Sequence, residues 1–513
     1  MSSPPRFRTA VRTQRLPAWL RLFLIGCMLL VSQPAGAAPG QVVDLDDLLA
    51  QNQPCVTTNV SSSTIQTCIT APSSGATLNG DVTISASVTA TSGGLPSIDT
   101  VRWYLTPASQ SGSTLIATEY QTPWTLQLPT NRWVDGQYRL GVNVVFKSGS
   151  STSTAQIPVT LNNGVSTAPG SNGSWSPVNV GGSSAHVVAV GDGASDRNAA
   201  AAVGALATNL NPDMFLYLGD VYDYGTYTEM YNYYGPTLGA LDSRTNPVPG
   251  NHEGKDNFRG YFDYWNSDTH YYSATAGGWK IIALNNNPQF PGQTSVGSAQ
   301  YNWLRDQLQN NSATCTMVIM HYPRFGLINT GGNAFMQPMW ELMVNNGVDV
   351  VLAGHEHNYQ RWSTLDANGQ VSSVGTTQYI VGSGGHSQDG ANVSDSRTQF
   401  FRSGLGVLSM QLNPNGGTAQ YITTAGAVVD SSTLNCNNGG GGTSTPTPTS
   451  TTPPGGSTTT LNPVADARVA AAAPTTNYGT QPTLLADTSP QEMSYLRFNV
   501  QGVNGTVTNA KLR

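Results

Sequence analysis

Five short polar clusters, each placed after a largely apolar run, constrain the fold of this chain more than any other feature. Short apolar runs of this kind indicate buried strands, and α/β sheets place functional side chains at the carboxyl ends of their strands. We therefore expect an α/β domain whose site is assembled from strand ends. The runs and clusters are 187–190 before Asp192, 215–218 before Gly219-Asp220, 247–249 before Gly250-Asn251-His252-Glu253, 317–320 before His321, and 348–353 before Gly354-His355-Glu356-His357.

The residue types in these clusters predict a site for two metal ions. Four of the 7 histidines of the chain lie inside the clusters, together with two aspartates and an asparagine. Carboxylate, imidazole and amide oxygen ligands suit iron, zinc or manganese better than a soft ion such as Cu(I). Two such metals held close together by a bridging carboxylate can clamp an in-line phosphoryl displacement. We expect two metal ions, iron with zinc or manganese.

Length and composition predict several domains. A chain of 513 residues exceeds what one hydrophobic core usually serves, and 55 glycines, 31 prolines and 10% charged residues are typical of a β-rich secreted protein. Residues 55–165 alternate apolar and polar side chains and read as an all-β sandwich, whereas residues 175–437 alternate strands with helices. Residues 438–460, rich in Gly, Thr and Pro, read as a linker before a further β-sandwich segment at 461–513.

The first 37 residues predict export. Five arginines precede an apolar run at 22–31 and the small-residue stretch Ala35-Gly36-Ala37, which is the pattern of a cleaved signal peptide. An amino-terminal membrane anchor is the alternative, but it needs about 20 apolar residues. Loss of this segment would change the formal net charge from −6 to −11 and leave an acidic protein without a basic cluster, which argues against nucleic-acid partners. We expect a secreted, periplasmic or cell-surface protein without a membrane span.

Four of the five cysteines remain once Cys27 is removed, and an even number in an oxidising compartment favours disulfides. Pairing Cys55 with Cys68 and Cys315 with Cys436 keeps each bridge inside one predicted domain. The two other connectivities stay open.

The five ordered clusters resemble those of the calcineurin-like metallophosphoesterase superfamily. This resemblance implies a four-layer α-β-β-α domain in which Asp220 bridges the two metals. It implies that Asp192 and His357 complete one metal's ligands, and that Asn251, His321 and His355 complete the other's. The resemblance also implies that His252 donates a proton to the leaving alkoxide, a role that suits an imidazole because its pKa lies near neutral pH. It implies that Glu253 accepts hydrogen bonds behind the metal ligands.

Two details resemble purple acid phosphatases within that superfamily. Asp192 is followed by Gly193-Ala194 and lacks the histidine that most members have there, and Gly354-His355-x-His357-x-Tyr359-x-Arg361 matches the last cluster in full. The tyrosine of Gly-Asp-x-x-Tyr is displaced, because Tyr222 stands two residues after Asp220 and Asp223 occupies the third place. Tyr222 is the expected metal ligand, or water takes its place. Tyr359, Arg361 and His386 are candidates for substrate contact, with a structural role as the alternative.

The flanking segments resemble two β-sandwich families. Residues 55–165 resemble bacterial immunoglobulin-like domains in their strand pattern and in Asp135-Gly136-Gln137-Tyr138. Residues 461–513 resemble the opening of a DNRLRE-type module, a family linked to carbohydrate binding, through Ala465-Asp466-Ala467, Asn477-Tyr478-Gly479 and Tyr495-Leu496-Arg497-Phe498. This segment stops where a strand should continue, so a longer sequence is expected. These segments imply contact with polysaccharide or cell wall.

Together these expectations describe an exported phosphohydrolase that cleaves small phosphomonoesters by attack of a metal-bound hydroxide. A phosphodiesterase or nucleotidase at the same site is the nearest alternative. A surface protein that binds polysaccharide and has an inert phosphatase-like domain is the alternative from another class.

Overall fold

The structure is a computed structural model, which describes residues 53–436 apart from 148–151, 194–195, 290–292 and 329–331, and the backbone of three strands after residue 462. The chain divides into two compact units, residues 1–442 and 443–513. The predicted signal peptide at 1–37 and the predicted linker at 438–460 lie outside the described residues. Among the described residues, no helix is both long and apolar enough to span a membrane.

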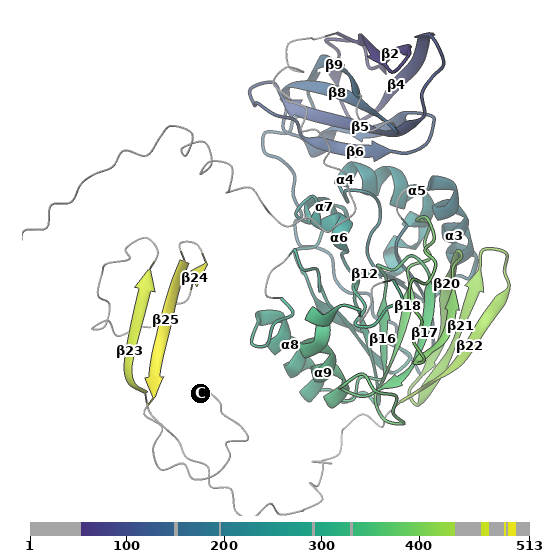
Figure 1. The fold of residues 1–513 in the computed structure, drawn as a ribbon, viewed down its shortest axis with the longest axis vertical. Helices are drawn as coiled ribbons and strands as arrows, with labels where there is room; N and C mark the ends of the chain where they lie inside the picture. The colour runs from purple at the N-terminus through teal and green to yellow at the C-terminus, as the bar shows by residue number, and fades with distance from the viewer. Residues whose placement is uncertain are drawn as a thin grey trace, which may run out of the picture. The chain divides into compact units, whose positions relative to one another are not determined.

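The amino-terminal part of the first unit is a two-sheet β structure (Figure 1). Strand order is β1-β2-β4-β7 in one sheet and β3-β9-β8-β5-β6 in the other. Alternate residues such as Trp103, Leu140 and Val142 are fully buried between the sheets, as the period of two predicts. The strands are β1 (Cys55–Val60), β2 (Ser63–Ala71), β3 (Thr77–Leu78), β4 (Asp81–Ser92), β5 (Ile98–Pro107), β6 (Leu115–Glu119), β7 (Thr125–Pro129), β8 (Gly136–Phe146) and β9 (Thr152–Leu161), with a short 3-10 turn η1 (Thr130–Arg132).

The central part contains two larger sheets. A six-stranded sheet has the order β12-β11-β10-β20-β21-β22, in which β10, β11 and β12 are parallel. A seven-stranded sheet has the order β13-β14-β15-β16-β18-β17-β19, in which β14, β15, β16 and β18 are parallel. The strands are β10 (Ala185–Val190), β11 (Met214–Tyr217), β12 (Thr245–Pro247), β13 (Tyr272–Ala276), β14 (Trp279–Ala283), β15 (Cys315–Ile319), β16 (Val350–Ala353), β17 (Tyr359–Leu365), β18 (Thr376–Val381), β19 (Thr398–Arg402), β20 (Gly406–Asn413), β21 (Gly416–Thr423) and β22 (Val428–Asn435).

Helices cover the outer faces of this pair of sheets, with α3 and α5 on the side of β20 and α8 and α9 beside β16 (Figure 1). Successive residues of β15 alternate between two cores: Met317 packs in the core between the sheets, and Val318 packs with Leu304 and Trp340 of the outer helices. The predicted four-layer domain is confirmed. The helical segments are α3 (Arg197–Asn209), α4 (Tyr227–Glu229), η2 (Met230–Tyr234), α5 (Gly235–Leu238), η3 (Gly239–Arg244), α6 (Asn251–Gly254), α7 (Arg259–Trp265), α8 (Ala299–Gln309), η4 (Ala334–Met336) and α9 (Gln337–Asn345).

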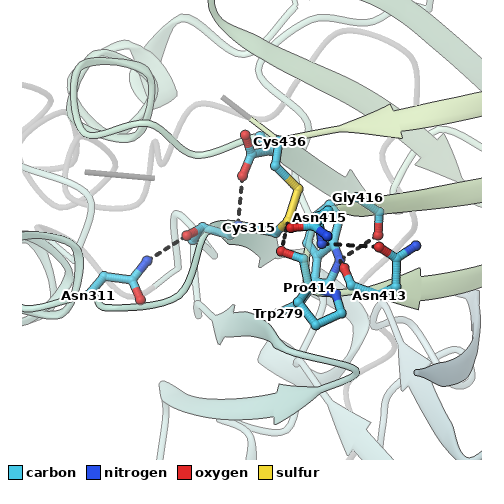
Figure 2. The surroundings of a disulfide bond; sticks show 10 residues. Trp279, Asn311, Cys315, Asn413, Pro414, Asn415, Gly416 and Cys436 are labelled. Atoms are coloured by element: carbon cyan, nitrogen blue, oxygen red, sulfur yellow. Dashed lines mark hydrogen bonds between the residues drawn. A yellow bond between two sulfur atoms is a disulfide. The ribbon is translucent and has the colours of Figure 1, made fainter. Parts of the chain in front are cut away.

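Both predicted disulfides are present. Cys55–Cys68 joins the paired strands β1 and β2, and Cys315–Cys436 joins β15 to the segment after β22. Figure 2 shows the second bridge beside Trp279, whose indole N–H donates to the carbonyls of Asn413 and Gly416 at 2.9 Å. The bridge therefore links the start of β15, an inner strand of the seven-stranded sheet, to the end of β22, an edge strand of the six-stranded sheet.

The second unit contains a three-stranded sheet of order β23-β25-β24. Its strands are β23 (Pro463–Ala470), β24 (Asp487–Thr488) and β25 (Gln491–Phe498). The Ala-Asp-Ala and Tyr-Leu-Arg-Phe motifs lie on the paired strands β23 and β25, whereas Asn477-Tyr478-Gly479 lies outside the described residues.

Candidate metal centre

All five polar clusters follow strands of the central domain, as the sequence predicts. Asp192, Asp220 and Asn251 follow β10, β11 and β12 of the six-stranded sheet, while His321 and His355 follow β15 and β16 of the other sheet. The site is therefore built where the parallel strands of two facing sheets end.

Three of these residues adopt the left-handed backbone conformation. Asp192 has φ 62°, Asp220 has φ 57° and His355 has φ 71°. Non-glycine residues in this region cost roughly 1–3 kcal/mol each, and such residues cluster at functional sites. Two neighbouring glycines leave room for the carboxylates of these aspartates: a Cβ on Gly250 would clash with Asp220 Oδ1, and one on Gly354 would clash with Asp192 Oδ2.

Asp220, His321 and His355 point ligand atoms at one another. One such atom from each residue lies within 4.8 Å of the other two, and the group could hold a metal ion. His321 Nε2 is 3.2 Å from Asp220 Oδ2. The Asn251 side-chain oxygen is 3.0 Å from His321 Nε2 and 2.9 Å from His355 Nδ1. Four polar groups of the type that iron, zinc and manganese prefer thus converge on one point.

Asp192 and His357 extend this group on one side. The Asp192 carboxylate accepts the backbone N–H of His355 at 2.9 and 3.0 Å, and Asp192 Oδ1 lies 3.8 Å from His357 Nε2. The structure therefore brings together the six residues that the resemblance names as ligands, apart from Tyr222: Asp192, Asp220, Asn251, His321, His355 and His357.

The electrostatics of the cluster suit a bound cation. Burial lowers the pKa of His355 and of His357 to about 3, so both imidazoles are neutral at pH 7 and keep a lone pair free. Burial alone would raise the pKa of Asp220, but the imidazoles of His321 and His252 outweigh it and hold that pKa below its usual range. Burial raises the pKa of Asp192 well above its usual range. Two buried carboxyl groups this close together are stabilised by a nearby positive charge.

Glu253 holds the turn beneath the centre, as its predicted acceptor role requires. Its fully buried carboxyl group accepts the backbone N–H groups of Asp220 at 2.9 Å, Val221 at 2.8 Å and Gly250 at 2.7 Å. These bonds join the segment after β11 to the segment after β12. Glu253 therefore fixes the distance between Asp220 and Asn251.

Two further residues that hold the ligand segments in place were not predicted from the sequence. Asn286 accepts the backbone N–H groups of His321 at 3.2 Å and Tyr322 at 3.1 Å, and Asn287 donates to the Gly250 carbonyl at 2.7 Å. Both asparagines follow β14, so the signal that marks the five clusters, a polar group after an apolar strand, also marks these residues.

His252 lies beside Asp220 and next to an unforeseen carboxylate. Its backbone N–H donates to Asp220 Oδ1 at 2.8 Å, and its Nε2 lies 3.7 Å from Asp220 Oδ2. On the other side, its Nδ1 lies 3.8 Å from Asp223 Oδ1, and Asp223 also receives a hydrogen bond of 3.2 Å from Lys255. An imidazole in this position can hold or move a proton beside the centre.

His386 also lies at the centre. Its ring centroid is 3.8 Å from that of His357 and 6.4 Å from that of His252. Asp389, three residues later, lies 3.4 Å from His357 Nδ1 and orients that ring from the side away from Asp192. Asp389 was not predicted from the sequence, because it lies eight residues beyond the end of β18 and not directly after an apolar strand.

Tyr222 points into an aromatic cluster. Its ring stacks on that of Tyr233 with centroids 3.6 Å apart. The side chain is buried, and Tyr120 packs against its edge at 6.4 Å. These contacts favour a packing role, so metal ligation by Tyr222 stays a prediction without support from its surroundings.

Tyr359 and Arg361 serve the fold below the site. Both side chains bind Asp430 on β22, Tyr359 through a hydrogen bond of 2.8 Å and Arg361 through two bonds of 2.8 and 2.9 Å. Tyr359 is 1% exposed and so is closed to substrate. The structural alternative therefore fits both residues, and the candidate substrate contact does not.

Comparison with known families assigns the three parts of the chain. Residues 186–359, which contain every residue of the centre up to His357, match the family described as calcineurin-like phosphoesterase. The central domain is a calcineurin-like phosphoesterase domain. Residues 66–142 match the bacterial Ig domain family, and residues 457–513 match carbohydrate-binding module family 96. These matches confirm the families that the sequence motifs predict.

Individual relatives of the phosphoesterase domain are purple acid phosphatases at low identity. Purple acid phosphatase 22 of Arabidopsis thaliana is 25% identical over 197 residues, which are 34% of this chain and 44% of the relative. Purple acid phosphatase 18 of the same plant is 30% identical over 122 residues, which are 23% of this chain and 27% of the relative. This chain thus spans less than half the length of either relative. The structure of purple acid phosphatase PPD1 from yellow lupin seeds covers 69% of this chain and 72% of its own, with 15% identity and a TM-score of 0.43.

Proposed function

We propose that the phosphoesterase domain hydrolyses phosphomonoesters at a centre of two metal ions. Asp220 would bridge the ions, with Asp192 and His357 completing one ligand set. Asn251, His321 and His355 would complete the other. The observation that carries the proposal is the convergence of Asn251, His321 and His355 on Asp220, with neighbouring ligand atoms 2.9 to 3.2 Å apart.

When bound, two such ions neutralise the charge on the phosphoryl oxygens and make a nucleophile available at neutral pH. The chain's own residues set the geometry. His252, 3.7 Å from Asp220, is placed to donate a proton to the leaving alkoxide. Glu253 keeps the ligand turns rigid, which matters because catalytic groups act only when held in position.

We further propose that the protein is exported after loss of residues 1–37, which agrees with the two disulfides of the described part. The predicted domain limits, 55–165 and 175–437 with a linker at 438–460, are proposed as functional boundaries. The carbohydrate-binding module would then tether the phosphatase to polysaccharide or cell wall.

The test uses the chain from residue 38 to residue 513. Its metal content is measured by mass spectrometry. Turnover of p-nitrophenyl phosphate is compared with that of bis-p-nitrophenyl phosphate, before and after chelation. About two metal ions per chain and chelator-sensitive monoester turnover would support the proposal. Preference for the diester would replace it with a phosphodiesterase, and no turnover after reconstitution with iron, zinc and manganese would overturn it.

A further inference from the structure

The amino-terminal Ig-like domain contacts one particular loop of the active site. This rim loop, residues 221–226, follows Asp220 directly. Thr226, at its end, donates its hydroxyl to the carbonyl of Ile116 on β6 at 2.5 Å. The loop is therefore attached to a different domain within six residues of the predicted bridging ligand.

Glu229 makes the same connection with a buried carboxyl group. One oxygen accepts the backbone N–H of Thr118 on β6 at 2.8 Å, and the other accepts the backbone N–H of Tyr224 in the rim loop at 2.7 Å. The side chain is fully buried, so no water competes for either bond. A single side chain thus joins the β6 backbone to the rim loop backbone.

A second set of contacts holds the end of β6 itself. The buried carboxylate of Glu119 accepts the Trp103 indole N–H at 2.7 Å and forms an ion pair with Arg197 of α3. Arg197 also donates to the Tyr233 hydroxyl at 3.0 Å, and that hydroxyl donates to the Thr118 carbonyl at 3.1 Å. Because breaking a buried charged pair is costly, the end of β6 has one position relative to α3.

Asp223 lies in the anchored rim loop and faces the active site. It directly precedes Tyr224, whose backbone N–H donates to Glu229. Asp223 Oδ1 lies 3.8 Å from His252 Nδ1, an atom that is buried and has no hydrogen-bond partner among the described residues. The path from the Ig-like domain to the proposed proton donor therefore runs from Thr118 through Glu229 and the rim-loop backbone to Asp223.

We propose that the Ig-like domain is a working part of the active site, in which Glu229 is a positioning residue that joins β6 to the rim loop and thereby places Asp223 beside His252. This inference rests on the proposed function for its effect on turnover. The physical reason is rigidity: the rim loop contains Gly225 with φ +60°, and a loop of this kind keeps one conformation only if outside contacts select it.

The kinetic test compares two matched variants of the full-length, metal-loaded protein. Glu229→Gln keeps the size of the side chain but replaces one of the two oxygens that accept the N–H groups of Thr118 and Tyr224 with an amide nitrogen, which cannot accept. Tyr231→Phe removes another bond between the same two domains, the 2.5 Å bond to Asp81, which does not involve the rim loop. We expect kcat for p-nitrophenyl phosphate to fall about tenfold in Glu229→Gln, with KM within about twofold of wild type, and no change in Tyr231→Phe. Unchanged kcat in Glu229→Gln, or equal loss in both variants, would overturn the inference.

Amide hydrogen exchange separates this inference from the proposed function. Exchange of a peptide that covers residues 221–226 should speed up in Glu229→Gln and stay at the wild-type rate in Tyr231→Phe, while peptides of the central sheets keep the wild-type rate in both variants. If the wild type turns over no phosphoester, the proposed function fails, and faster exchange of the rim loop in Glu229→Gln still supports positioning of the loop by the Ig-like domain. Wild-type exchange of the rim loop in Glu229→Gln overturns the inference, whatever the activity.

Discussion

Tyr359 donates its hydroxyl to the carboxylate of Asp430 at 2.8 Å, and this bond ties β17 of one central sheet to β22 of the other. Arg361 binds the same carboxylate with two further hydrogen bonds. Part of the last sequence motif therefore serves the junction of the two sheets and not the substrate.

Tyr359→Phe should lower the free energy of unfolding by about 1–2 kcal/mol, because it removes a buried hydrogen bond to a charged group. Urea unfolding and steady-state kinetics of the same preparation measure the two effects, with kcat/KM expected to stay at the wild-type value. Tyr379→Phe, which removes a bond of 2.9 Å to the neutral Ser432, is the matched control and should cost less. A raised KM with unchanged stability would restore the substrate-contact interpretation.

His355→Ala should remove metal and turnover together. The imidazole is one of the groups that converge on Asp220 and Asn251, and loss of one ligand from such a set weakens binding strongly. Metal content by mass spectrometry is the first measurement, followed by turnover of p-nitrophenyl phosphate. His186→Ala is the control, since His186 on β10 bonds Ser409 away from the centre. Full metal content in His355→Ala would exclude this histidine as a ligand.

The two disulfides should differ in their effect on stability. Cys315–Cys436 closes a loop with a sequence separation of 121, whereas Cys55–Cys68 closes one of 13. In the chain-entropy view the longer loop is worth about 4–5 kcal/mol and the shorter about 3. Thermal unfolding without reductant should show a larger loss for the double variant Cys315→Ala/Cys436→Ala than for Cys55→Ala/Cys68→Ala. A larger loss of stability for Cys55→Ala/Cys68→Ala would mean that contacts in the folded state, and not loop length, determine how much each disulfide stabilises the protein.

Stability should fall as pH rises from about 4.5 to about 8. Burial, followed by the charge of Asp223, raises the pKa of Glu229 from 4.5 to about 8 in the folded chain. The folded state therefore holds a proton in this window that the unfolded state has lost. The stability that the neutral form contributes is complete below the unfolded pKa and disappears through the folded pKa, with a slope of up to about 1.4 kcal/mol per pH unit.

Urea unfolding of wild type and Glu229→Gln at pH 5, 6, 7 and 8 measures this dependence. The glutamine side chain does not titrate, so the variant should show a shallower fall across the same window. Parallel curves for the two proteins would show that Glu229 keeps an ordinary pKa.

Local sequence patterns determined much of this protein. Apolar runs followed by polar clusters placed Asp192, Asp220, Asn251, His321 and His355 at strand ends, because a strand's period and its exit from the sheet are properties of a few consecutive residues. The same locality explains why the cysteine pairs could be assigned by predicted domain. By contrast, no local sequence pattern predicts the left-handed backbone conformation of Asp220.

Only the tertiary structure decided where the longer side chains go. Tyr222, for which the sequence left metal ligation or replacement by water open, stacks on Tyr233, while Asn286 and Glu229 reach backbone groups 35 and 111 residues away. Such contacts depend on which surfaces meet when sheets and domains pack. A buried polar group must find whatever partner that packing brings within about 3 Å, and sequence spacing does not encode that distance.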